Sequence, residues 1–361
     1  MSQLGNPILP LVNPRRIAVF GSGAVVQSLL RNLASGSLAG NIHYVGAEQV
    51  DWAGVACYAN VALLPGRIAL AAVVCGAAEL PEVLVGCASK GVEIVILYTS
   101  DVGFGQRPAL RAQAAELGIR LFGPSAFGCM LPHARINLTP IAHVVPPGNL
   151  ALVSQSTSVC ANILDWSHNH EFAFSAIFGC GQSSDIELPE ILDYLANDLK
   201  TDSILLYLEG LHDARRFLSA VRAAAAVKPV IAIKAGQHVV SASVATAHIG
   251  AAAGCDDAFD AALRRAGVLR VRTIGDMFSA ARALITPKRP KGNRLAVVAN
   301  GGAAAIMALD LAAELGIVAA NLSSATQQTL RALPTAPWSQ GNPVDIGFNA
   351  PPKNWLAAIA A

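Results

Sequence analysis

Short apolar runs alternate with longer alanine- and leucine-rich stretches along most of the chain. The short runs are apolar without interruption, which is typical of parallel strands covered on both faces, and the longer stretches carry apolar residues at helical spacing. The pattern predicts strands at Ile17–Gly21, Ile42–Val45, Leu70–Cys75, Glu93–Tyr98, Leu150–Ser154, Ser203–Leu208, Pro229–Lys234 and Arg294–Asn300. It predicts helices at Ala24–Ala34, Pro108–Leu117, Pro189–Ala196, Ala214–Ala226 and Ala303–Leu315. This alternation predicts an α/β fold built on parallel sheets.

Two joints divide the pattern. His143–Asn149 reads HVVPPGN and Thr286–Arg294 reads TPKRPKGNR, and clusters of proline, glycine and polar residues are typical of connections. We therefore expect domains at residues 1–146, 147–288 and 289–361. The last segment offers a strand, a helix and a second strand at Val318–Leu322. Three elements can bury only a small core. We therefore expect this segment to be the front part of a further, truncated domain.

Composition excludes several classes of protein. Hydrophobic residues make up 53% of the 361 residues and charged residues 14%, which excludes a disordered chain. The net charge of +2 gives no broad basic surface for nucleic acid. The longest apolar run, Ile68–Ala78, has 11 residues, whereas a membrane-spanning helix needs about 20. Prolines interrupt the N-terminus where a signal peptide is apolar, so we expect a cytoplasmic protein with a small-molecule partner and no membrane contact.

Three of the predicted strand-to-helix turns consist of small residues. They are Gly21-Ser22-Gly23, Ser154-Gln155-Ser156-Thr157-Ser158 and Asn300-Gly301-Gly302. Each would direct backbone N–H groups and a helix N-terminus at one point, where an anion can bind. The first turn reads G-x-G-x-x-V, a dinucleotide fingerprint without its third glycine, and no acidic residue clearly ends the next strand. An NAD-binding domain is therefore an alternative that rests on this turn alone.

One carboxylate and one histidine stand where chemistry is expected. Glu209 ends the apolar strand ILLYLEG, at the carboxyl edge where open α/β sheets bind ligands. His248 lies in SASVATAHIGAAAG, whose small side chains leave room at the ring, and a nearby carboxylate could hold one tautomer. The alternative for His248 is an ordinary capped loop histidine. The other histidines show no known metal-binding spacing, so we expect no tightly bound metal.

The segment Leu150–Arg272 resembles the NDP-forming acyl-CoA synthetases, which are relatives of the succinyl-CoA synthetase α subunit. The motifs that carry the resemblance are LALVSQSTSVCANILDW, GCGQSSDIELPEILDYLANDLK, KPVIAIKAG and TAHIGAAAGCDDAFDAALRRAG. Further similarity runs through GNRLAVVANGG and NPVDI to about Ile346, and NPRRIAVFG and GPSAFGCMLP are similar, more loosely, to the family's CoA-binding domain. Within the family, the motifs are most similar to the synthetase-like region of bacterial protein lysine acetyltransferases.

The resemblance implies a Rossmann-like CoA-binding domain followed by flavodoxin-like domains. It implies the reaction of an acid, CoA and ATP to acyl-CoA, ADP and phosphate, through an acyl phosphate and a phosphohistidine. His248 matches the phosphorylated histidine and Glu209 the carboxylate that orients it. The residues implied in binding CoA and the phosphoryl group are Gly21, Ser22, Gly23, Gly123, Pro124, Ser125, Ser154, Ser156 and Thr157.

The chain departs from the family pattern at two positions. Thr157 replaces the last glycine of the S-Q-S-G turn, which places a β-branched side chain where phosphate would approach the backbone. Glu48 replaces a lysine that the family has for a CoA phosphate, which weakens the expected CoA affinity.

The sequence contains no ATP-grasp part to handle ATP and ADP. The resemblance therefore implies an ATP-grasp subunit or domain as partner, and an oligomer. The alternative function is a non-catalytic region of a protein lysine acetyltransferase that senses CoA or acyl-CoA. The acyl substrate is not identified by the sequence.

Overall fold

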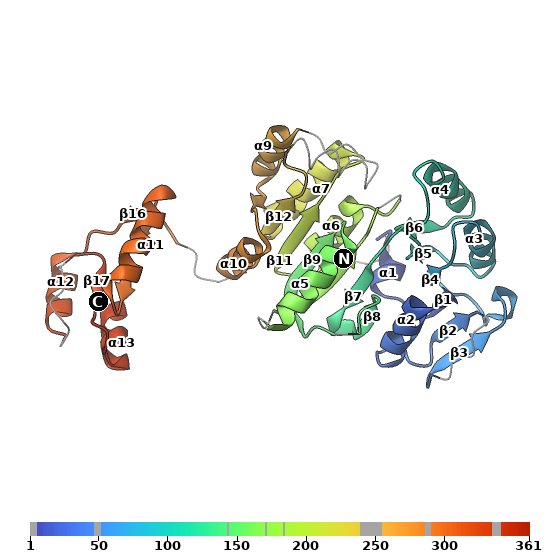
Figure 1. The fold of residues 1–361 in the computed structure, drawn as a ribbon, viewed down its shortest axis with the longest axis horizontal. Coiled ribbons are helices and arrows are strands. Elements are labelled where there is room, and N and C mark those ends of the chain that lie inside the picture. The colour runs from blue at the N-terminus through green and yellow to red at the C-terminus, as the bar shows by residue number, and fades with distance from the viewer. Residues whose placement is uncertain are drawn as a thin grey trace. The chain divides into compact units, whose positions relative to one another are not determined.

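The computed structural model describes residues 6–46, 52–142, 144–169, 172–182, 185–238, 255–285, 290–333 and 341–361. The chain forms two compact units, residues 1–286 and 287–361. The first unit holds both large sheets, which lie side by side in Figure 1. The α/β fold with parallel sheets is confirmed. Each predicted helix is present and matches the observed bounds to within one residue at either end.

The first sheet has six parallel strands in the order β3-β2-β1-β4-β5-β6. Its strands are β1 (Ile17–Gly21), β2 (Ile42–Val45), β3 (Val55–Tyr58), β4 (Leu70–Val74), β5 (Ile94–Leu97) and β6 (Arg120–Phe122). The helical elements are α1 (Leu9–Val12), α2 (Ala24–Ala34), η1 (Val61–Leu63), α3 (Leu80–Ser89) and α4 (Arg107–Glu116). The strand order reverses between β1 and β4, which is the switch point where doubly wound sheets bind ligands.

Apolar residues on both faces of each strand explain why this sheet forms. Ile17 and Val19 of β1 lie in one core with α2, whereas Ala18 and Phe20 lie in a second core with α3 and α4. Successive side chains of a strand point to opposite faces. The uninterrupted apolar runs in the sequence therefore correspond to strands that are buried on both sides.

The second sheet has seven strands in the order β13-β12-β11-β9-β10-β7-β8. Its strands are β7 (Gly128–Leu131), β8 (Ile136–Leu138), β9 (Pro147–Ser154), β10 (Phe174–Gly179), β11 (Ser203–Leu208), β12 (Val230–Lys234) and β13 (Leu269–Arg270). The helical elements are η2 (Pro132–Ala134), α5 (Thr157–Asn169), α6 (Leu188–Asn197), α7 (Ala214–Val227), α9 (Asp256–Ala266) and α10 (Ile274–Ile285). β7 pairs antiparallel with β10 and with β8, and the other pairs are parallel.

Strands β7 and β8 connect the two sheets. They precede the boundary predicted at residue 146, and yet they pair in the second sheet. The two sheets also share one continuous apolar core, to which Val19 of the first sheet and Val153 of the second both belong. The two halves of this unit are therefore packed against each other through a common core.

An ion network around one buried carboxylate lies between the two sheets. Arg120 of β6 lies 2.9 Å from Asp185 and 3.1 Å from Glu190, and Arg216 of α7 lies 2.6 Å from the same Glu190. The Asp185 carboxylate also accepts a hydrogen bond from the backbone N–H of Leu121 at 2.9 Å. Because Glu190 is only 4% exposed, two arginines compensate a carboxylate that has almost no access to water.

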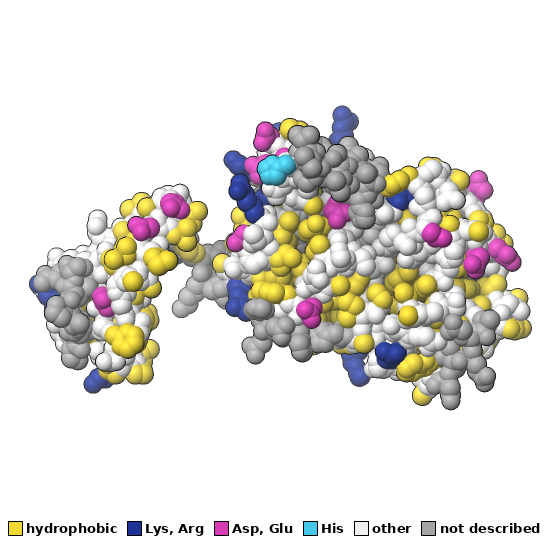
Figure 2. Space-filling model, in the orientation of Figure 1, with side chains coloured by type: hydrophobic (Ala, Val, Ile, Leu, Met, Phe, Trp, Pro, Cys, Tyr) yellow, Lys and Arg dark blue, Asp and Glu magenta, His cyan; other side chains and the backbone are white. Residues whose placement is uncertain are grey.

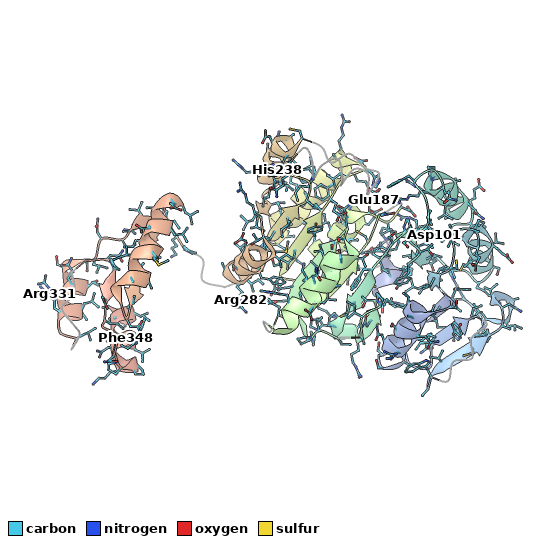
Figure 3. The ribbon with its side chains drawn as sticks, viewed as in Figure 1. Asp101, Glu187, His238, Arg282, Arg331 and Phe348 are labelled. Carbon is cyan, nitrogen blue, oxygen red and sulfur yellow. The ribbon has the colours of Figure 1, made fainter. Side chains whose placement is uncertain are left out.

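The second unit is small. Its elements are β14 (Arg294–Leu295), β15 (Val298–Ala299), α11 (Gly302–Glu314), β16 (Val318–Ala319), α12 (Ser324–Arg331), β17 (Val344–Asp345) and α13 (Pro352–Ala360). The single strand predicted at Arg294–Asn300 is wrong: β14 pairs with β16, and β15 pairs with β17. Hydrophobic side chains appear on the face of this unit shown in Figure 2, and Phe348, which Figure 3 labels, is 84% exposed.

Candidate functional site

The turn after β9 caps the N-terminus of α5 with serine side chains. The hydroxyl of Ser154, which is fully buried, accepts a hydrogen bond from the N–H of Ser156 at 3.0 Å. The hydroxyl of Ser156 in turn accepts one from the N–H of Val159 at 3.3 Å, which is the usual bond of a helix N-cap. The predicted anion-binding turn therefore has the local structure of a capped helix N-terminus at the carboxyl edge of the sheet.

Gln155 joins this turn to the residues that follow β11. Its Oε1 accepts hydrogen bonds from the N–H groups of Glu209 at 2.7 Å and Gly210 at 3.3 Å. Its Nε2 donates to the carbonyl oxygen of Gly210 at 2.8 Å. Glu209 is partly buried. The backbone that carries the predicted carboxylate is thus fixed directly beside the start of α5.

Thr157, the first residue of α5, contacts the turn that follows the last strand of the first sheet. Its hydroxyl donates a hydrogen bond to the carbonyl oxygen of Ser125 at 3.1 Å. Ser125 belongs to the Gly123-Pro124-Ser125 turn after β6 and adopts a φ of 55°, while its N–H donates to the carbonyl oxygen of Thr99 at 2.8 Å. The hydroxyl at this position therefore has a structural partner, and its expected crowding of a phosphate stays a prediction.

The turn after β10 closes against the same Gly123-Pro124-Ser125 turn. The N–H of Gln182 donates to the carbonyl oxygen of Pro124 at 3.0 Å. Gly181 has a φ of 59°, and a Cβ at this position would overlap the carbonyl oxygen of Ser125. Only glycine meets both requirements. Together with the contacts of Gln155 and Thr157, this places the predicted residues of the turns after β6, β9 and β11 close to one another.

The Gly21-Ser22-Gly23 turn lies elsewhere on the carboxyl edge of the first sheet, because β4 and β5 separate β1 from β6. Gly21 has a φ of 112°, and a Cβ there would overlap the carbonyl oxygen of Val74. Gly23, with a φ of 88°, is the N-cap residue of α2, and a Cβ there would have no atom within 4 Å. A glycine at a helix N-terminus, with space where a Cβ would stand, fits the phosphates of CoA.

Two predicted residues lie outside the described part of the chain. His248 falls in the segment 239–254 and Glu48 in the segment 47–51. The pairing of His248 with Glu209 and the charge reversal at Glu48 therefore stay predictions. Within the described residues, no group of three or more His, Cys, Asp or Glu side chains could hold a metal ion. No helix of the described part is long and apolar enough to cross a membrane.

Sequence reasoning missed several charged residues around the site. Lys234 ends β12 beside Leu208 of β11 and is only 1% exposed. Burial lowers the pKa of Lys234, while the charges of Asp256 and Glu209 act in the opposite direction. The motif KPVIAIKAG contained this lysine, and its place at a strand's carboxyl end was the available signal.

Sequence reasoning also missed a pairing of a histidine with a carboxylate. His212 Nδ1 lies 3.5 Å from an Oε atom of Glu187, which stands at the start of α6 (Figure 3). Burial lowers the pKa of His212, and the charges of Arg107 and Arg111 lower it further. Burial raises the pKa of Glu187. His212 and Glu187 line one small pocket together with Gln155.

Comparison with known proteins assigns the two sheets to known domains. Residues 15–132 match the CoA binding domain, and residues 147–284 match the succinyl-CoA ligase like flavodoxin domain. The α subunit of ADP-forming acetate–CoA ligase I of Pyrococcus furiosus is 32% identical over 365 residues, covering 97% of this chain and 78% of that protein. The α subunit of ligase II of the same organism is 33% identical over 344 residues, covering 92% and 75%. The chain belongs to the family of ADP-forming acetate–CoA ligase α subunits.

Solved structures agree with this family. The acetyl-coenzyme A synthetase 1 of Ca. Korarchaeum cryptofilum, described as dinucleotide-forming and solved with phosphate and ADP, has 29% identity and a TM-score of 0.89. The similarity covers 98% of this chain and 78% of that one.

A further relative by sequence is a longer protein. The ADP-forming acetate–CoA ligase I of Archaeoglobus fulgidus is 31% identical, and this chain spans 50% of its length. The predicted resemblance to acyl-CoA synthetases is thus confirmed, and these relatives do not favour the acyl-CoA-sensing alternative.

The matched domains also contain the predicted turns. The Gly21-Ser22-Gly23 and Gly123-Pro124-Ser125 turns lie within the CoA binding domain. The Ser154–Ser158 turn and Glu209 lie within the ligase-like flavodoxin domain. CoA binding is therefore supported for the first sheet.

Proposed function

We propose that this chain is the α part of an ADP-forming acid–CoA ligase and that His248 carries the phosphoryl group between ATP and the acid. The observation that supports the site most strongly is the Gln155 contact, which holds the backbone of Glu209 beside the N-terminus of α5. The names of the relatives, ADP-forming acetate–CoA ligase α subunits, support the reaction class.

Each part of the site has a physical task in this proposal. The capped N-terminus of α5 stabilises the negative charge of the phosphoryl group through backbone N–H groups and the helix dipole. Glu209 accepts a hydrogen bond from the imidazole and so holds the tautomer whose other nitrogen bonds to phosphorus. A carboxylate oxygen of the acid then forms a bond to phosphorus while the phosphorus–nitrogen bond breaks and its electron pair returns to the ring.

CoA would bind along the carboxyl edge of the first sheet. Gly21, Ser22 and Gly23 would hold its phosphates, and the Gly123-Pro124-Ser125 turn lies on the side of the second sheet. Its thiol supplies the nucleophile that takes the acyl group and releases phosphate. Calorimetric titration of the full chain is expected to show CoA binding. A chain that binds NADH but does not bind CoA would contradict the assignment.

The charge at Glu48 offers a matched test of the CoA site. We expect Glu48→Lys to strengthen CoA binding by about 1 kcal/mol or less, the scale of an exposed charge contact. Glu116→Lys, which makes the same charge change at the C-terminal end of α4, is the control and should leave the affinity unchanged. Equal effects of the two variants would contradict a phosphate contact at position 48.

We also propose that an ATP-grasp subunit phosphorylates His248, that the working protein is an oligomer, and that it acts in the cytoplasm. The test is reconstitution with an ATP-grasp subunit, ATP, CoA and a series of short carboxylic acids. Acyl-CoA and ADP should appear in equal amounts. ADP release without acyl-CoA, or no reaction with a subunit that is active with another α chain, would overturn the proposal.

A further inference from the structure

Arg107 extends from the first sheet's half of the molecule to the second. It is the first residue of α4, in the region that follows β5. Its Nη2 donates a hydrogen bond to Oε1 of Gln182, in the turn after β10, and its Nε donates to the carbonyl oxygen of Val102 at 3.4 Å. The guanidinium carbon lies 4.0 Å from the ring centre of Phe104. These contacts fix a half-buried positive charge at the boundary between the two halves.

Hydrogen bonds connect this guanidinium to the expected phosphoryl site. Gln182, which accepts from Arg107, donates its own N–H to Pro124 at 3.0 Å. The next residue, Ser125, accepts the hydroxyl of Thr157, where α5 begins. Arg107 also influences His212, in the loop that begins with Glu209, since its charge helps to lower the pKa of that histidine. The guanidinium is therefore linked to the α5 N-terminus through the turns after β10 and β6, and its charge reaches the loop that begins with Glu209.

A cation beside the expected phosphoryl site would favour the proposed reaction. The acid's carboxylate and the phosphoryl group are both negative, and they must approach to bonding distance. A guanidinium offers a planar fork of donors that matches a carboxylate and remains charged throughout. The amide oxygen of Gln182 is a neutral acceptor, which a carboxylate oxygen can replace with a stronger, charge-assisted bond.

We propose that Arg107 binds the carboxylate of the acid substrate and then the acyl phosphate made from it. This inference rests on the proposed function, because it assumes phosphoryl transfer at the α5 N-terminus. During the transfer the carboxylate oxygen forms its bond to phosphorus as the bond to the imidazole nitrogen breaks. The guanidinium keeps its protons and stabilises the charge on the acyl phosphate.

Arg111 provides a matched control. It lies one turn further along α4, is exposed, and also lowers the pKa of His212 through its charge. Arg111→Gln and Arg107→Gln therefore remove the same charge from the same helix. Among the described residues, the contacts that hold a guanidinium beside Gln182 and Phe104 belong to Arg107.

Acetyl phosphate carrying ³²P is the probe, because phosphoryl transfer in the reverse direction would label the histidine of the full chain without an ATP-grasp subunit. We expect Arg107→Gln to raise the half-saturating concentration of acetyl phosphate at least tenfold. Arg111→Gln should change it less than twofold, and Arg107→Lys, which keeps the charge but loses the fork, should fall between them. CoA affinity, measured by calorimetry, should remain within twofold of wild type in all three.

A purely structural role gives a different result. Gln182→Leu removes the amide that accepts from Arg107 Nη2 and keeps the guanidinium in the chain. If Arg107 only joined the two halves, both Arg107→Gln and Gln182→Leu would lower the midpoint of thermal unfolding with an unchanged half-saturating concentration. That result, or equal changes in Arg107→Gln and Arg111→Gln, would overturn the inference. If Arg107→Gln does not fold, an unchanged half-saturating concentration in Arg107→Lys overturns the inference equally. Absence of label in the wild type would instead contradict the phosphohistidine proposal itself.

Discussion

The side chain of Gln155 holds the backbone of Glu209 in place: Oε1 accepts from the Glu209 N–H at 2.7 Å. Gln155 itself is only 7% exposed, and it also bonds both backbone groups of Gly210. A neutral residue of the β9–α5 turn thereby fixes the position of the charged residue that is expected to orient the reacting histidine. This contact makes the two neighbouring strands one functional element.

Replacing Gln155 tests this role. Leucine is similar in size to glutamine, but Gln155→Leu leaves two N–H groups and one carbonyl group without this partner. We therefore expect the free energy of unfolding to fall by about 2 kcal/mol. Urea titration measures this change, and acyl-CoA formation should fall with it. Gln113→Leu is the control, because the amide of Gln113 makes one exposed bond to Pro81. A Gln155→Leu protein as stable and active as the Gln113→Leu protein would contradict the role of Gln155.

The contact between Thr157 and Ser125 predicts a second difference. Thr157→Val keeps the shape of the side chain but removes the hydroxyl, which should lower the free energy of unfolding by about 1 kcal/mol or less at this exposed position. Thr157→Ser keeps the hydroxyl and should resemble wild type more closely. Chemical unfolding compares the two variants, and a valine variant more stable than the serine variant would show that the hydrogen bond contributes nothing.

The buried Glu190 predicts a larger effect. Glu190→Gln keeps the shape but removes the charge that compensates Arg120 and Arg216. Because both arginines reach solvent in part, we expect a loss of about 2 kcal/mol, below the range for fully buried pairs. Glu93→Gln, in the exposed pair with Arg67, is the control and should cost about 0.5 kcal/mol or less. Losses of similar size would argue against the network as a link between the halves.

His43 makes stability depend on pH. Its ring lies in β2 and is 7% exposed, and its Nδ1 has no hydrogen-bond partner among the described residues. Burial lowers the pKa of His43 below its ordinary value of 6.5, and the charge of Arg16 lowers it further. The unfolded chain therefore binds more protons, and this contribution to stability is lost as the pH falls below 6.5.

The expected slope for His43 is at most about 1.4 kcal/mol per pH unit. The urea midpoint of the wild type should decrease as the pH is lowered from about 8 to about 5. In His43→Phe, which keeps a buried ring, the midpoint should decrease less steeply. His212, whose pKa is also lowered, adds a dependence of the same sign that remains in this variant. Identical profiles for the two proteins would rule out a contribution from His43.

The sequence predicted the parallel strands β1, β2, β4, β5, β9, β11 and β12, because uninterrupted apolar runs have one common interpretation in α/β proteins. It missed the parallel strands β3, β6, β10 and β13. It did not predict β7 and β8, whose short runs GCML and INL show no periodicity and pair antiparallel in the other half's sheet. The turns were visible as runs of small residues, but their mutual contacts were not. Arg107 and Gln182 are 75 positions apart, and neither belongs to a recognisable pattern.

The most direct test of the central claim is to locate the phosphoryl group. The full chain, an active ATP-grasp subunit and γ-³²P-labelled ATP should give a label that is lost in acid, stable in base, and mapped to His248 by mass spectrometry. His248→Ala should abolish the label, Glu209→Gln should slow its formation, and His238→Ala, at an exposed histidine (Figure 3), should leave it unchanged. A label that persists in His248→Ala, or no label at all with an active ATP-grasp subunit, would contradict the account.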